Sequence, residues 1–222
     1  LLPWSLLLAS CASAPAPGER LERHGDEIVV CGQLFHTGAP VVLWTDPGGY
    51  DAYRVEKRFS KLEESSWDKT KGIDSPNRYG MRLQGLTPEQ IERVRGGGWD
   101  LETLRQVVDQ FVLHYDVAGT SRTCFLVLHD RRGLSVHFML DVDGTIYQTL
   151  DLKESAWHAT ISNQRSIGIE IANMGAYAEG EKDPFDGWYE RDSEGVRLKL
   201  AGRPIRTPNF VGRPSRAEPV TG

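Results

Sequence analysis

The chain has few cysteines and no run of basic residues. Three cysteines stand among 222 residues and none forms a Cys-x-x-Cys pair, so a zinc site built from cysteine is not expected. The net charge of −5 gives no basic field for holding nucleic acid. The Gly-x-Ser-x-Gly, His-Glu-x-x-His and P-loop patterns are also missing. Serine hydrolases, helix-type metalloproteases and nucleotide-binding proteins therefore lack support.

The apolar run at the start of the chain is too short to span a bilayer, which takes about 20 residues. It fits the apolar region of a secretory signal, and its ending, residues 8–11, resembles a bacterial lipobox that would acylate Cys11. An Ala/Pro-rich stretch typical of a tether follows. We expect residues 1–24 to be a lipoprotein signal and tether, and the protein to be exported to the cell envelope, touching the membrane only through a lipid anchor. The alternative is an ordinary cleaved signal with a chance cysteine.

With Cys11 lipidated, only Cys31 and Cys124 remain. Export makes a disulfide chemically feasible, but a separation of about 90 residues carries no spacing signal. The favoured interpretation is two small buried residues.

Residues 25–98 are expected to form a β-rich N-terminal extension. Residues 27–38 and 40–44 have strand character, and the second run ends in the turn sequence of residues 46–49. A short helix is predicted to begin at Pro88, with Thr87 as its N-cap.

Residues 99–222 carry the pattern of an α/β domain. Asp100 is expected to cap a helix, and Asp143-Gly144 to form a type I′ hairpin turn. The remaining predicted elements are strands over 111–115 and 166–171 and a helix over 121–129, with Phe125 and Leu128 facing inward. This order predicts a mixed central β-sheet flanked by helices.

Two residues in this part have side chains that could do chemistry. His114 ends an apolar strand, where an isolated histidine is more often a core residue than a ligand. Glu170 lies inside the apolar strand 167–171, and a buried carboxylate is unfavourable unless it is paired or used. It could form a salt bridge with Arg165 or Arg122, or act as a general base.

Four segments together resemble one family. They are residues 111–115, 135–148, 156–159 and 166–171, and they resemble the zinc-dependent N-acetylmuramoyl-L-alanine amidases of type 2, which include the peptidoglycan recognition proteins. The resemblance implies an amidase-like α/β fold and a Zn²⁺ cofactor. It also implies hydrolysis of the amide between N-acetylmuramic acid and L-alanine in peptidoglycan or muramyl peptides.

Six residues of this chain match positions with roles in the family. By resemblance, His114 is a zinc ligand, and Glu170 takes a proton from the attacking water and returns it to the leaving nitrogen. His158, Trp157 and His137 are expected to bind the muramyl peptide, with His137 on the pocket wall or behind it. Asn163, in turn, is expected to shape the loop before the last strand.

The chain also departs from the family pattern. Val136 stands where one branch has a catalytic tyrosine, which favours the branch that uses glutamate. The family completes its zinc site with a second histidine and then an aspartate or cysteine, but no histidine follows His158. We therefore expect residues 99–222 to be an amidase domain that is incomplete at its C-terminus. The 222-residue chain should bind zinc weakly and be inactive.

Two other functions stay open: a non-catalytic peptidoglycan-binding module, and a structural lipoprotein with core histidines. The amidase interpretation predicts that four side chains, those of His114, His137, His158 and Glu170, converge on one face of the sheet. The other three histidines (His24, His36 and His129) are expected at the surface.

Overall fold

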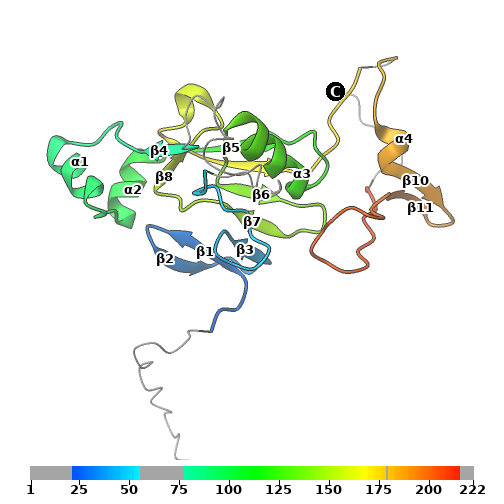
Figure 1. Cartoon of the computed structure of the whole chain (residues 1–222), viewed down its shortest axis with the longest axis horizontal. Helices are drawn as coiled ribbons and strands as arrows, with labels where there is room; N and C mark the ends of the chain where they lie inside the picture. Colours follow the sequence, from blue (N-terminus) through cyan, green and yellow to red (C-terminus); the bar gives the residue numbers. More distant parts are fainter. Residues whose placement is uncertain (1–21, 56–77, 179, 216–222) are drawn as a thin grey trace, which may run out of the picture.

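The computed structural model describes residues 22–55, 78–178 and 180–215. Its centre is a five-stranded mixed sheet in the order β3-β7-β6-β9-β5 (Figure 1). Strand β6 is antiparallel to β7, while β3 is parallel to β7, and β9 is parallel to both β6 and β5. The strands are β3 (Val41–Leu43), β5 (Gln110–Tyr115), β6 (Phe138–Leu140), β7 (Ile146–Gln148) and β9 (Ser166–Ile171). The predicted α/β class with a mixed sheet is confirmed.

The N-terminal segment is built into this sheet. Strands β1 (Glu27–Val30) and β2 (Gln33–His36) form a hairpin, and β3 then pairs with β7. Strand β4 (Tyr79–Met81) is antiparallel to β8 (Glu154–Ala156). The sheet therefore takes strands from both sides of residue 98, and the predicted domain boundaries stay predictions. The lipidation site predicted at Cys11 lies outside the described residues.

Helix caps agree with the sequence signals. In α1 (Pro88–Arg95), the Thr87 hydroxyl accepts from the Gln90 amide, and the Gln90 side chain bonds back to the cap. In α2 (Leu101–Val107), Asp100 accepts from the Thr103 amide. The predicted helix at 121–129 runs further, as α3 (Ser121–Phe125) followed by a π-helix over Leu126–Arg132.

Two apolar layers cover opposite faces of the sheet, because side chains alternate along each strand. Met139 and Tyr147 pack with Phe125 and Leu128 on the face beneath α3. Phe138 and its neighbours pack on the other face, against residues of α2 and the β1–β2 hairpin. Figure 1 shows α3 and the hairpin on opposite sides of the sheet. A polar side chain on one of these strands therefore lies either on the face beneath α3 or on the face against α2 and the hairpin.

Two local predictions are wrong. Among the described residues around the β6–β7 hairpin, Gly144 has φ +82° but Asp143 has no positive φ, so the turn is not type I′. The Gly144 amide donates to the Asp141 carbonyl and the Asp141 amide to the Thr145 carbonyl, a type I turn with a glycine bulge. His129 is also buried, not exposed, because its imidazole stacks on Phe125.

The C-terminal part adds elements that the sequence pattern did not predict. They are α4 (Phe185–Trp188) and the hairpin of β10 (Tyr189–Asp192) with β11 (Gly195–Leu198). Trp188 packs closely on Gly119, where a larger residue would collide with its ring. Within the described ranges, no helix has the length and apolar character needed to cross a membrane.

Candidate active site

His114 and Glu170 occupy the same register position on neighbouring parallel strands. Glu170 is also paired with Met139 of β6, whose side chain belongs to the core beneath α3. Register partners in a parallel sheet direct their side chains to the same face. His114 and Glu170 therefore lie together on the face covered by α3.

His158 reaches the same face from the connection between β8 and β9. Its Nδ1 lies 3.0 Å from Nε2 of His114, and its Nε2 lies 3.1 Å from Oγ of Ser166. The imidazole lies against Gly168, where a Cβ would be 2.5 Å from two ring atoms. Asn163 holds the loop, because its side-chain oxygen accepts from the backbone amides of His158 and Ala159. The structural role predicted for Asn163 agrees with these bonds.

Burial keeps the two histidines uncharged. It lowers the pKa of His114, and it lowers the pKa of His158 to about 4, with His114 and Arg82 adding to the effect. Both rings are then neutral at pH 7. Neutral imidazole is the form that binds a metal ion or accepts a proton.

The environment of Glu170 favours the protonated form of its carboxyl. Burial first and the charge of Asp116 second raise the pKa of Glu170 to about 7, against the opposing effect of Arg132. A carboxyl with this pKa can both take and release a proton near neutrality. Of the two salt-bridge partners weighed from the sequence, Arg165 pairs instead with Asp109 through two hydrogen bonds.

His137 is close to the site but does not face a substrate. Its ring centroid lies 5.9 Å from that of His158, and its side chain is fully buried. The Gly168 amide donates to Nδ1, and Nε2 lies 2.9 Å from the Glu154 carbonyl. The prediction that His137 contacts substrate is corrected, because both nitrogens are occupied inside the protein.

Trp157 is half-buried beside the site. Its backbone amide donates to Oγ of Ser135, and its indole nitrogen lies near Gly80 of β4. The contact with substrate expected for Trp157 and His158 remains a prediction.

The described residues meet part of what a zinc ion requires. His114 and His158 present two neutral nitrogens 3.0 Å apart, which suits the imidazole ligands of zinc. Within the described part of the chain, however, three potential ligand atoms lie within 4.8 Å of one another only in the group of Asp26, Glu27 and His36. Among the described residues, the His114 site therefore has no compact third ligand.

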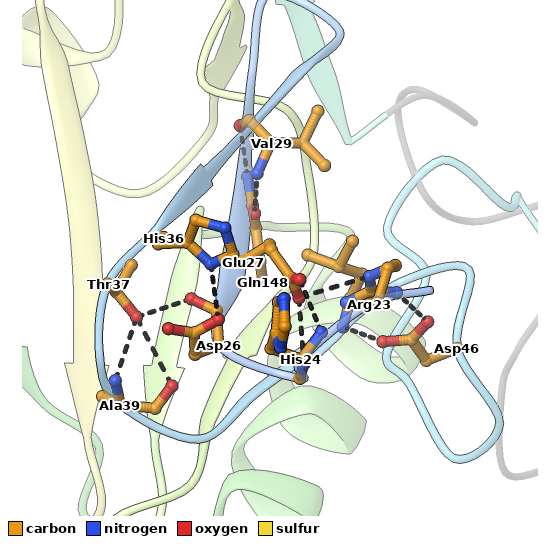
Figure 2. Close-up of polar contacts among 12 residues, drawn as sticks. Arg23, His24, Asp26, Glu27, Val29, His36, Thr37, Ala39, Asp46 and Gln148 are labelled. Atoms are coloured by element: carbon orange, nitrogen blue, oxygen red, sulfur yellow. Dashed lines mark hydrogen bonds and ion pairs between the residues drawn. The ribbon is translucent and has the colours of Figure 1, made fainter. Parts of the chain in front are cut away.

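The group of Asp26, Glu27 and His36 lies at the open end of the β1–β2 hairpin (Figure 2). Nδ1 of His36 lies 2.9 Å from Asp26, and Glu27 accepts from the backbone amides of His24 and Gly25. Arg23 is 3.5 Å from Glu27, so a cation is already present. These atoms are used in hydrogen bonds within the protein, and the group carries no argument for a metal.

A cavity of about 530 Å³ lies at the ends of the strands that carry the site. Ala172 and Asn173, which follow Glu170 along the chain, form one wall, and residues from Trp188 to Pro214 form the other. Carboxyl ends of parallel strands are common places for ligands. His114, His158 and Glu170 do not line this cavity, so it does not by itself place a substrate at the site.

Sequence reasoning missed three residues that shape the site: Arg82, Ser166 and Gly168. The sequence does contain a signal for Gly168, because a glycine inside a strand often marks a place where another group approaches the backbone closely. Arg82 had none, because its partners are distant in the sequence.

Residues 104–203 match the model of a protein family described as N-acetylmuramoyl-L-alanine amidase, which confirms the resemblance for this region. A crystal structure of a selenomethionine AmpD derivative aligns with 18% identity and a TM-score of 0.26. The alignment covers 46% of this chain and 62% of that one, less than two thirds of its length. No curated protein matches the chain.

Proposed function

We propose that the protein hydrolyses the amide between N-acetylmuramic acid and L-alanine in peptidoglycan or muropeptides, because residues 104–203 match the model of a family described as N-acetylmuramoyl-L-alanine amidase. The observation that carries the proposal is the shared register of His114 and Glu170, with the pKa of Glu170 raised to about 7. A base of that pKa, next to a neutral imidazole, suits the attack of water on an amide.

Each residue has a distinct part in this reaction. Glu170 takes a proton from the attacking water as the new C–O bond forms at the amide carbon. It then gives a proton to the L-alanine nitrogen as the C–N bond breaks, leaving a carboxylic acid and a free amine. We assign contact with the muramyl peptide to His158 and Trp157, and His158 also holds the ring of His114 in one orientation.

Zinc is the cofactor that this proposal requires. Bound at His114, it would supply Lewis-acid polarisation of the amide carbonyl. His158 offers a second nitrogen beside His114, and the other ligands would come from residues other than those described.

The test measures peptide release from purified muropeptides, with zinc added, by this chain and by a longer form that supplies a further histidine and an aspartate or cysteine. The longer form should release peptide, and Glu170→Ala should abolish release while leaving zinc binding largely intact. Normal turnover by Glu170→Ala would overturn the assignment. The 222-residue chain should show little or no activity.

A peptidoglycan-binding module is the second candidate, favoured by the absence of a compact three-ligand group around His114 in the described residues. Muropeptide binding without peptide release, by both forms of the chain, would support it.

Acylation at Cys11 and a cell-envelope location are proposed from the sequence alone. Mass spectrometry of the mature N-terminus tests them.

A further inference from the structure

Arg82 lies directly after β4, the strand that pairs with β8 and thus runs beside the segment leading to His158. Its side chain has no exposed surface. The guanidinium donates to four backbone carbonyls, those of Leu152, Asn163, Gln164 and Ser166, at 2.8–3.1 Å. One of its nitrogens also lies 3.0 Å from Nε2 of His137.

A buried cation held by neutral carbonyls is unusual, because burial disfavours the charged form. Burial lowers the pKa of Arg82 to about 10, so the side chain stays charged near neutral pH. The guanidinium fork has five donors in one rigid plane. It therefore fixes the carbonyls that it contacts relative to one another, which several shorter side chains could not do.

Two of these carbonyls belong to residues that hold His158 directly. Asn163, whose carbonyl Arg82 binds, accepts with its side chain from the amides of His158 and Ala159. Ser166, whose carbonyl Arg82 also binds, places its Oγ 3.1 Å from Nε2 of His158.

His137 lies beside the Arg82 guanidinium and supports the His158 ring by a separate route. Because Nδ1 of His137 accepts from the Gly168 amide, Nε2 carries the proton and donates to the Glu154 carbonyl. The nearby charge of Arg82, together with burial, keeps this ring neutral. His137 thereby holds Gly168, the residue on which the His158 ring rests.

We propose that Arg82, from the N-terminal segment, is a positioning residue that fixes the ring of His158 against His114. Its bonds to the carbonyls of Asn163 and Ser166 hold the two residues whose side chains contact His158. Its effect on turnover rests on the proposed amidase function, but its effect on the His158 ring does not.

The test uses the metal-free 222-residue chain with ¹⁵N-labelled histidine. Long-range ¹H–¹⁵N spectra at one pH distinguish a ring fixed in one tautomer from a ring that exchanges between two. In the unmodified chain, His158 should show one tautomer. In Arg82→Met and Arg82→Lys, its two ¹⁵N shifts should move toward each other, since neither side chain can bind all four carbonyls.

Arg78→Met is the matched control. Arg78 is equally buried and donates to the carbonyls of His129, Arg54 and Val55, none of which holds His158. The control should leave the His158 signals unchanged. If Arg82→Met does not fold, Arg82→Lys decides, because it keeps the charge and loses the fork.

A folded Arg82→Lys chain with unaltered His158 signals would overturn the positioning role. In a form of the protein that releases peptide, Arg82→Lys should lower kcat at least tenfold with a smaller change in KM. If no form releases peptide, the proposed function fails, while the spectra still decide the role of Arg82.

Discussion

Gly168 and His158 are fitted to each other: the imidazole occupies the space that a side chain at position 168 would fill. A Cβ there would lie 2.5 Å from Cε1 and from Nδ1 of His158. Nδ1 is also the atom that lies 3.0 Å from His114. The absence of a side chain at one strand position thus lets two histidines meet.

Gly168→Ala should therefore displace the His158 ring and separate it from His114. We expect a loss of about 1–3 kcal/mol in the free energy of unfolding, as for other overpacked sites, and, in the longer form that releases peptide, at least a tenfold loss of amidase activity. Denaturant unfolding and peptide release measure the two effects. Gly80→Ala is the control, since a Cβ there would lie 3.7 Å from Trp157 Nε1, an ordinary contact. Equal losses in both variants would contradict the fit described for Gly168.

In the longer form that releases peptide, Glu170→Gln should abolish release while preserving the fold. The amide is nearly the same size as the carboxyl but cannot accept the proton of the attacking water, so we expect a loss of at least about 100-fold in kcat. A steady-state assay measures it, with circular dichroism to show that the fold is kept. Activity within about threefold of the unmodified enzyme would exclude Glu170 as the base.

The same substitution should change how stability depends on pH. The folded-state pKa of Glu170, about 7, lies above its ordinary value of 4.5. The folded chain therefore holds this proton more tightly than the unfolded chain, and its contribution to stability is present below about pH 4.5 and lost as the pH rises through 7. Glu170→Gln should remove this loss. Because Glu170 is partly exposed and screened, we expect a relative gain on the order of 1 kcal/mol at pH 8, and none at pH 4. If the difference in thermal stability between Glu170→Gln and the unmodified chain were the same at both pH values, the raised pKa would be contradicted.

Local signals in the sequence predicted the local structure well. The run from Ser166 to Ile171 is a strand with the predicted bounds, and Thr87 and Asp100 cap their helices as expected. Each of these depends on residues within a few positions, so the sequence contains the whole interaction. The convergence of His114, His158 and Glu170 could be predicted because the family resemblance placed them on one sheet.

Features that depend on distant contacts could not be predicted in this way. Arg82 binds carbonyls about 80 residues away in the sequence, which no periodicity reveals. Asp-Gly suits both a type I′ turn and a type I turn with a bulge, so the sequence alone did not separate them. Strand β10 is rich in charged residues and has no apolar alternation, and it forms because β11 pairs with it.

Zinc should bind this chain weakly, through His114. Two neutral imidazoles 3.0 Å apart can share a metal ion, but the described residues offer no compact third ligand at that place, and tight zinc sites use at least three protein ligands. Isothermal titration calorimetry at pH 7.5 should show binding that His114→Ala removes. His36→Ala is the control, because Nδ1 of His36 is already engaged with Asp26 at the exposed hairpin (Figure 2). If His36→Ala removed zinc binding and His114→Ala did not, the zinc would bind at the hairpin. The proposal that His114 holds the zinc ion would then be wrong.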